Sequence, residues 1–260
     1  MTQKEPKFTR REALAGAGAV GFAALGAASG RPTGTDNWDG YTDYTYAQTD
    51  TSLNLLVGWR RTENGTVVGS SPVGAVDDVE TAGIRLFDVD DALPHDTGTA
   101  SVGLRLEDPE DTARLWLRVD PDLNGADAAS AALAERIALS VRYDTGILGV
   151  GGCGGAEGEF AAAGEEIAAG TLAEIDGSAL ADGIELHPGV LGDGCLAPGE
   201  QRCLIFAWEF DAEGGSAGQG GAVDFVVEFL ADECDAEGNP FEMSDESAES
   251  GSIDADGGGA

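Results

Sequence analysis

The sequence predicts an all-β protein, a jelly-roll-like β-sandwich with one or two short helices in its connections and disordered termini. Two observations support this fold class. Apolar and polar side chains alternate with a period of two in seven segments, and residues that favour turns separate those segments. Together they favour two stacked sheets in one domain. The segments cover residues 53–59, 84–89, 100–106, 115–119, 137–143, 204–210 and 223–229.

Local signals describe three of the connections. Asn64-Gly65 follows the first segment and predicts a two-residue type I′ hairpin turn, because both turn positions need a positive φ. The Gly-rich stretch Glu213–Gly221 is predicted to join the last two segments as a hairpin. Gly149–Gly164 consists almost entirely of Gly, Ala and Glu, so we expect a surface loop that Cys153 ties to the body.

Helical signals are few. Asp127–Arg136 predicts one short helix, with Asn124 as its cap. Gly170–Ala181 has apolar residues at helical spacing and predicts a second. Both helices fall within connections between the alternating segments.

The N-terminus has the pattern of an export signal. Arg10 and Arg11 precede the uncharged run Ala13–Ala28, which is typical of a twin-arginine signal peptide, predicted here as residues 1–29. At 16 residues, this Ala/Gly-rich run is too short to be a good membrane span. We therefore expect an extracellular or cell-surface protein without stable membrane insertion once the signal is removed.

The remaining chain divides into three predicted parts. Residues 30–51 form a flexible N-terminal segment, and residues 52–235 form the β-sandwich domain. Residues 236–260 are acidic and poor in apolar side chains. Such a tail cannot bury enough surface to fold, so we predict that it is disordered.

The charge balance limits the partners that the protein can have. The chain has 14 basic and 48 acidic residues, of which four basic and two acidic residues lie in the predicted signal. The rest of the chain therefore has 10 basic residues, all arginines, and 46 acidic residues. Molar salt shortens the Debye length to about 3 Å and screens the resulting repulsion. We interpret this composition as an adaptation to a habitat near salt saturation. The absence of a basic patch from the sequence argues against nucleic-acid binding.

Cysteine usage indicates an oxidising compartment. Four cysteines occur in the chain, and an even number in an exported protein favours two disulfides over a zinc site, which normally includes a close Cys-x2–4-Cys pair. Three connectivities are open from the sequence alone. The cysteines are Cys153, Cys195, Cys203 and Cys234.

Candidate ligand and modification sites are weak. Asp120, Asp122 and Asn124 reproduce the first half of a calcium loop, but Ala131 stands where the last acidic ligand is expected. A solvated turn explains the same residues. Asn64-Gly65-Thr66 is an N-glycosylation sequon on the predicted hairpin tip.

Signals for catalysis are weaker still. The chain has only two histidines, His95 and His187, and no H-E-x-x-H motif. The G-x-S-x-G match at Gly214–Gly218 precedes a predicted strand, whereas a nucleophile elbow requires a helix after the serine. We therefore expect no enzymatic activity and no cofactor, apart from the weak calcium candidate.

The order of several short motifs resembles the TasA/camelysin family of secreted matrix-fibre proteins, in its haloarchaeal branch. This resemblance extends from Leu53 to Asp235. The motifs that carry it are Leu53–Trp59, Leu93–Thr99 followed by Ala100–Leu106, Asp108-Pro109 before Leu115–Leu117, Ala132–Ile137, Val141–Asp144, Cys203–Glu209 and Glu228–Cys234.

The resemblance implies a jelly-roll sandwich that self-associates into biofilm-matrix or surface fibres, so we expect its partners to be other copies of itself or other surface proteins. In fibre-forming relatives, an N-terminal segment of one subunit completes a sheet of the next, and the aromatic segment Tyr41–Tyr46 is the matching candidate here. The alternative is a flexible leader whose tyrosines pack on their own domain. The family's short Ala-x-Phe-Ser-Asp-type motif is absent, with Asp36–Asp39 in its neighbourhood. The alternatives are a monomeric secreted module that binds calcium or carbohydrate and, less favoured, a secreted hydrolase.

Overall fold

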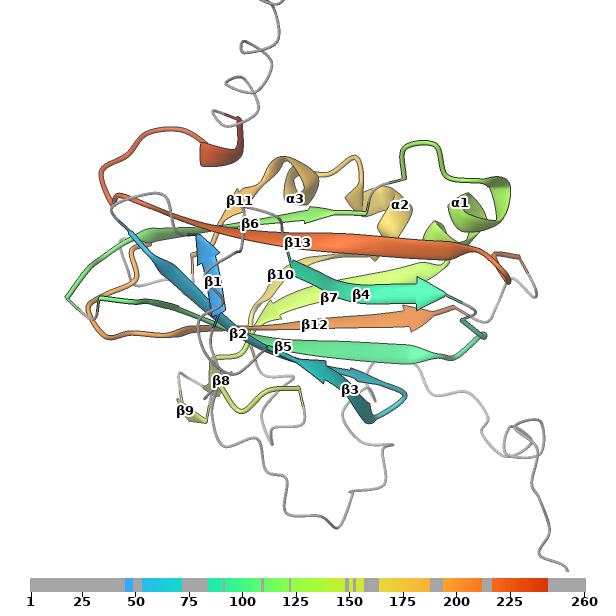
Figure 1. The fold of residues 1–260 in the computed structure, drawn as a ribbon, viewed down its shortest axis with the longest axis horizontal. Coiled ribbons are helices and arrows are strands. Elements are labelled where there is room, and N and C mark those ends of the chain that lie inside the picture. The colour runs from blue at the N-terminus through green and yellow to red at the C-terminus, as the bar shows by residue number, and fades with distance from the viewer. Residues whose placement is uncertain are drawn as a thin grey trace, which may run out of the picture. The chain divides into compact units, whose positions relative to one another are not determined.

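Two antiparallel sheets pack face to face in the computed structural model (Figure 1), which confirms the predicted all-β sandwich. The structure describes residues 45–48, 53–71, 84–90, 92–108, 110–121, 123–147, 150–151, 153–156, 164–187, 194–211 and 217–242. Within them, no helix is long and apolar enough to span a bilayer.

The first sheet runs in the order β1-β2-β5-β12-β7-β10, and β3 also pairs with β2. Its strands are β1 (Thr45–Gln48), β2 (Leu55–Glu63), β3 (Thr66–Ser70), β5 (Thr97–Leu106), β7 (Ile137–Tyr143), β10 (Glu166–Thr171) and β12 (Arg202–Phe210). The second sheet runs in the order β11-β6-β13-β4. Its strands are β4 (Ile84–Asp90), β6 (Arg114–Asp120), β11 (Ile184–Glu185) and β13 (Ala222–Asp232). A small ladder joins β8 (Gly146–Ile147) to β9 (Val150–Gly151).

The alternating side chains fill the space between the sheets. Along β7, every second residue from Ile137 to Tyr143 is buried, as the period of two requires. Phe87 of β4 packs on Phe225 of β13 with ring centroids 4.8 Å apart. Phe206 of β12 meets Phe229 of β13 edge to face at 6.5 Å, which ties the two sheets together.

Most connections change sheet, as in a jelly roll: β2, β5 and β7 lie in the first sheet, whereas β4 and β6 lie in the second. The predicted hairpin over Glu213–Gly221 is wrong, because β12 and β13 belong to different sheets. Two glycines of this connection, Gly218 and Gly221, lie against the backbone of α1 (Ala128–Ala134). The linker is long enough to cross between layers, and alternation within a strand does not specify the sheet.

The predicted type I′ hairpin is confirmed. Asn64 and Gly65 have φ values of 48° and 75°, and they join β2 to β3. The positive φ at Gly65 is favourable because glycine lacks a Cβ, and Asn tolerates the left-handed region better than most residues.

Both predicted helices require correction. Helix α1 is capped by Asp127, whose carboxylate accepts from the amides of Ala129 and Ser130, and not by Asn124. The predicted helix over Gly170–Ala181 begins as strand β10, followed by two separate four-residue helices, α2 (Leu172–Ile175) and α3 (Ala179–Asp182). A capping box of Thr171 with Glu174 starts α2, so the strand ends where the helix is capped.

The sandwich domain is wider than residues 52–235. Strand β1 falls in the segment that we predicted to be flexible, and residues 236–242 of the predicted disordered tail pack on the second sheet. There, Phe241 is 2% exposed and lies under the guanidinium of Arg118, 4.5 Å from the ring centroid. Asn239 donates to the carbonyl of Asp182. The predicted signal with Arg10 and Arg11, and residues 243–260, lie outside the described residues.

Candidate functional site

Strand β1 occupies an edge of the first sheet. It pairs antiparallel with the first half of β2, with Thr45 opposite Val57 and Tyr46 opposite Leu56. A bulge follows, and Gln48 then lies opposite Leu55. Main-chain pairing does not depend on the side chains of the added strand, so the edge of β2 holds β1 through backbone hydrogen bonds.

The side chain of Gln48 connects β1 to the second sheet. Its Nε2 donates to the carbonyl of Ala231 at 3.2 Å, and its Oε1 accepts from the Ala231 amide at 2.7 Å. Ala231 lies on β13 beyond Val227, where the pairing with β4 ends. The buried carboxamide of Gln48 therefore takes the place of β4 in hydrogen bonding to the main chain of Ala231. Strand β1 thus contacts both sheets, β2 in the first and β13 in the second (Figure 1).

Strand β1 is the less securely held partner in this arrangement. It has four residues, whereas β2 has nine. The hydroxyl of Thr45 is buried and has no hydrogen-bond partner, which costs about 1–3 kcal/mol. A short strand with an unsatisfied buried hydroxyl leaves its edge more easily than a central strand does.

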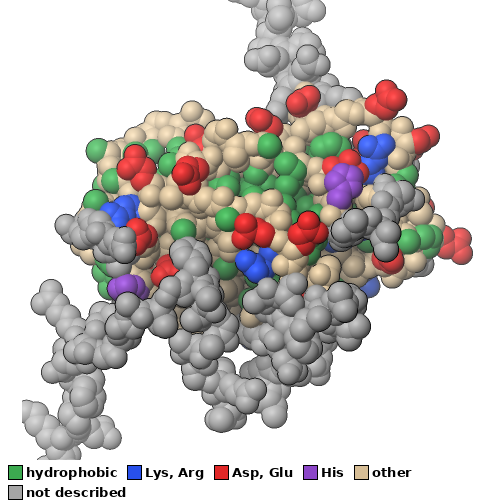
Figure 2. Space-filling model, turned by 180° about the vertical axis from the view of Figure 1, so that it is seen from behind, with side chains coloured by type: hydrophobic (Ala, Val, Ile, Leu, Met, Phe, Trp, Pro, Cys, Tyr) green, Lys and Arg blue, Asp and Glu red, His purple; other side chains and the backbone are tan. Residues whose placement is uncertain are grey.

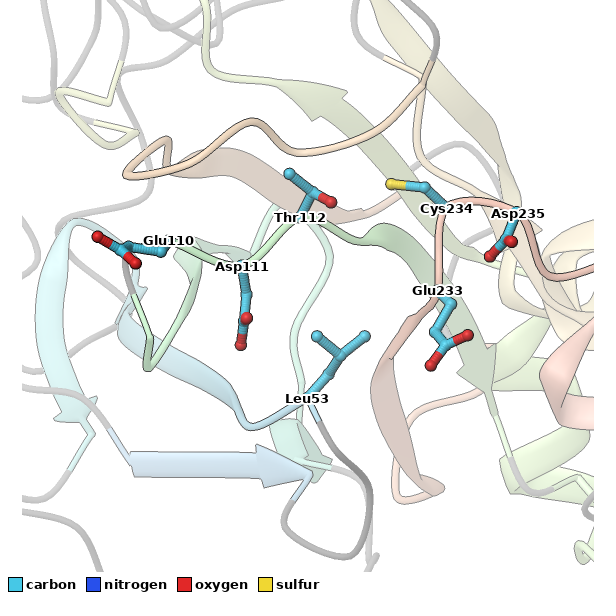
Figure 3. A pocket seen from close by; sticks show the side chains of 7 residues that line it. All are labelled: Leu53, Glu110, Asp111, Thr112, Glu233, Cys234 and Asp235. Atoms are coloured by element: carbon cyan, nitrogen blue, oxygen red, sulfur yellow. The ribbon is translucent and has the colours of Figure 1, made fainter.

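An acidic hollow of about 410 Å³ opens at the end of the sandwich where β2 begins (Figure 3). It is lined by Leu53, Glu110, Asp111, Thr112, Glu233, Cys234 and Asp235. In this view, the carboxylates of Glu110 and Glu233 lie on opposite sides of the hollow. Among the described residues, no group of three or more His, Cys, Asp or Glu side chains is placed to hold a metal ion.

Both disulfides are formed, and their pairing is Cys153–Cys203 and Cys195–Cys234. The Cα atoms are 5.3 Å and 6.0 Å apart, respectively. The first bond ties the loop after β9 to β12, as the sequence predicted for Cys153. The second ties the chain before β12 to the end of β13. Two disulfides fit an oxidising, extracellular environment.

The loop around Cys153 is also held by a buried carboxylate. Asp144 is 2% exposed, and its Oδ2 accepts from the amide of Gly155 at 2.8 Å. Burial raises the pKa of this carboxyl, and the hydrogen bonds from the loop amides oppose that shift. The next amide, of Ala156, donates to the hydroxyl of Ser101 on β5 at 2.7 Å. These contacts place the loop on the outer surface of the first sheet.

The calcium candidate is only partly described. Asp120 lies at the exposed end of β6, and Asn124 lies in an exposed turn beside Gly125, whose φ is 78°. Asp122 lies outside the described residues. Calcium binding stays a prediction.

The sequon asparagine has a structural role that the sequence did not reveal. The Nδ2 of Asn64, to which a glycan would be attached, donates to Asp96 at 3.0 Å. Its Oδ1 accepts from the Thr97 amide at 3.0 Å. The side chain therefore joins the β2–β3 turn to the loop before β5. Glycosylation stays a prediction, and it would have to displace this contact.

The two histidines do not share a site. His95 lies in the loop before β5, whereas His187 follows β11 and lies near the start of β6, where Leu186 donates to Leu115. These positions are at opposite ends of the sandwich, because β5 runs away from His95 toward the connection that leads into β6. His187 Nε2 lies 3.3 Å from a carboxylate oxygen of Glu185.

The chain was compared with protein-family models, curated proteins and solved structures, and none of them matches it. The resemblance to the TasA/camelysin family accordingly rests on the sequence motifs.

Proposed function

We propose that the protein is a secreted structural component of the cell surface or extracellular matrix, and that its copies assemble into fibres by exchanging strand β1. The observation that carries this proposal is the position of β1. A four-residue strand near the N-terminus closes the edge at β2 and reaches the second sheet through Gln48 and Ala231.

The same contacts are available to β1 of a neighbouring copy. The backbone ladder with β2 accepts any extended chain, and the bond from Gln48 to Ala231 selects the register. Such an exchange is a head-to-tail contact, and contacts of this type form open filaments when their rotation does not close a ring. One binding mode, repeated at each subunit, is therefore sufficient to build a fibre.

The charge of the molecule sets the conditions for assembly. Acidic side chains are spread over the face drawn in Figure 2, and the whole chain has a formal charge of −34. Copies with this charge repel one another in dilute buffer, and molar salt screens the repulsion. Export by a twin-arginine route would deliver the sandwich already folded to a saline exterior, where we expect assembly to occur.

The second candidate is a monomeric secreted module that binds calcium or carbohydrate, for which the acidic hollow is the place to look, although among the described residues its carboxylates do not form a group of three placed to hold a metal ion. Four of its seven lining residues are Asp or Glu. A ligand that binds only the folded state raises the melting temperature in proportion to the logarithm of its concentration. A monomeric mass in molar salt with such a calcium-dependent shift would favour this candidate over the fibre subunit.

Electron microscopy of the exported form in molar NaCl or KCl tests the leading proposal. We expect filaments, and we expect deletion of residues 36–51 to abolish them. A synthetic peptide of residues 41–51, added in excess, should shorten the filaments of the intact protein, whereas a scrambled peptide of the same composition should not. Dispersed monomers at every concentration would contradict the proposal.

A further inference from the structure

We propose that the free edge of β3 is a second self-association surface, which pairs antiparallel with β3 of another copy. This contact uses a different strand from the β1 contact, and it is two-fold symmetric, whereas the exchange of β1 is head-to-tail. Its biological setting rests on the proposed function, in which it would join neighbouring fibres side by side.

Strand β3 is exposed along its length, unlike the other edges. Four of its five residues are exposed, and the fifth, Gly69, is half-buried. Val67 is 48% and Val68 40% exposed. Among the described residues, the only other exposed large apolar side chain is Leu93, at 43%. Within the same set, β3 pairs with β2 alone, so its outer edge has no strand partner there.

The remaining edges have features that hinder pairing. Strand β10 begins with Glu166, whose carboxylate lies 3.6 Å from the guanidinium of Arg142. On β4, the carbonyl of Leu86 accepts from Arg61 at 3.4 Å. Strand β11 has only two residues, one of which is Glu185. Charges, side-chain caps and short length all protect an edge strand from adding another chain.

The lack of charge on this edge makes a second copy of the chain an acceptable partner. Residues 64–71 include no charged side chain, in a chain that is 24% charged. Like charges directly opposite each other destabilise a strand pair, and the edges at β10 and β11 would bring Glu166 and Glu185 against an identical partner. An uncharged edge avoids that cost when the partner has the same sequence.

A two-fold pairing centred on Val68 is self-complementary. It sets Val68 opposite the partner's Val68, and Thr66 opposite the partner's Ser70. In that register Val67 lies opposite the partner's Gly69, so the apolar contact of the new ladder is the one between the two Val68 side chains, at the residue where the register of β3 with β2 shifts. A five-residue ladder buries much less than the roughly 1,000 Å² of a stable interface, so each contact is weak and acts through repetition along a fibre.

The hairpin that carries β3 is fixed in place before any pairing. At one end of β3, the Ser71 amide donates to the carbonyl of Trp59 at 2.8 Å. At the other end, the bond from Asn64 to Asp96 anchors the turn. A pre-organised edge loses less conformational entropy on association than a mobile one.

Disulfide trapping tests the pairing directly. In the exported form with Val68→Cys, oxidation should link two copies at least about tenfold faster than in the matched variant Leu93→Cys, because only residue 68 faces itself across the two-fold axis. Leu93 is equally exposed but lies outside any strand. Equal rates for the two variants would overturn the proposal.

Electron microscopy separates this surface from the β1 contact. Val68→Glu should leave single filaments intact and abolish their lateral bundles, while Leu93→Glu should keep both. The melting temperature of Val68→Glu should equal that of the parent, because Val68 is exposed. Bundles that persist in Val68→Glu would overturn the proposal. If strand exchange fails instead, no filaments form, yet Val68→Cys still traps dimers faster than Leu93→Cys.

Discussion

Gln48 and Ala231 are 183 residues apart in the sequence and are joined by two hydrogen bonds in the fold. One side chain satisfies both main-chain groups of a residue in the opposite sheet. This pair closes the sandwich between β2 and β13, and it makes the N-terminal strand part of the folded domain. The same pair would hold a neighbouring copy if β1 were exchanged.

Replacement of this glutamine tests its contribution to stability. Gln48→Ala leaves the buried amide and carbonyl of Ala231 without partners, so we expect the free energy of unfolding to fall by about 1–3 kcal/mol. Gln201→Ala is a matched control, because Gln201 is exposed and should tolerate the change. Denaturant unfolding in molar salt measures both. Equal stability of the two variants would show that the Gln48 contact contributes nothing.

Gly98 and Trp208 form a second close contact that constrains the sequence. A Cβ at Gly98 would collide with the indole of Trp208, whose Nε1 is buried. We expect Gly98→Ala to destabilise the fold by about 1–3 kcal/mol, the usual cost of overpacking. Gly177→Ala provides the comparison, since its Cβ would meet no atom within 4 Å. The melting temperature should fall for the first variant only.

Asp144 should make stability depend on pH. Burial raises the pKa of its carboxyl in the folded state above the ordinary value of 3.8. A raised folded-state pKa favours folding at low pH, and this contribution is lost as the pH rises through the folded pKa. The difference in unfolding free energy between the parent and Asp144→Asn should therefore shift against the parent as the pH rises above about 4. A difference that is constant from pH 3 to 8 would refute this.

The strands of the core were predictable because alternation reports burial directly. Ile137–Tyr143 was predicted with the bounds that the structure has, and its alternate residues face the other sheet. Strand β10 was missed because Ala168, Ala169 and Gly170 give an edge strand no contrast between its faces. Sheet membership was also missed, since the pattern of a strand specifies its buried face and not its neighbours.

The candidate site was less predictable than the fold. The segment ending at Tyr46 was singled out by its aromatic and Thr-rich composition, and residues 45–48 do form a strand. Nothing in the sequence marks Gln48, because its partner is distant and a single glutamine has no characteristic pattern. The Asn64-Gly65 turn was likewise predicted, but the contact of Asn64 with Asp96 depends on tertiary structure.

Strand exchange itself can be measured with two single-cysteine variants. Tyr46 and Leu56 are opposite each other in the pairing of β1 with β2. When Tyr46→Cys and Leu56→Cys chains are mixed in molar salt and oxidised, we predict covalent dimers that contain one copy of each variant, at a level well above that of either variant alone. Heterodimers no more abundant than the dimers that either variant forms alone would contradict exchange of β1, and with it the proposed fibre.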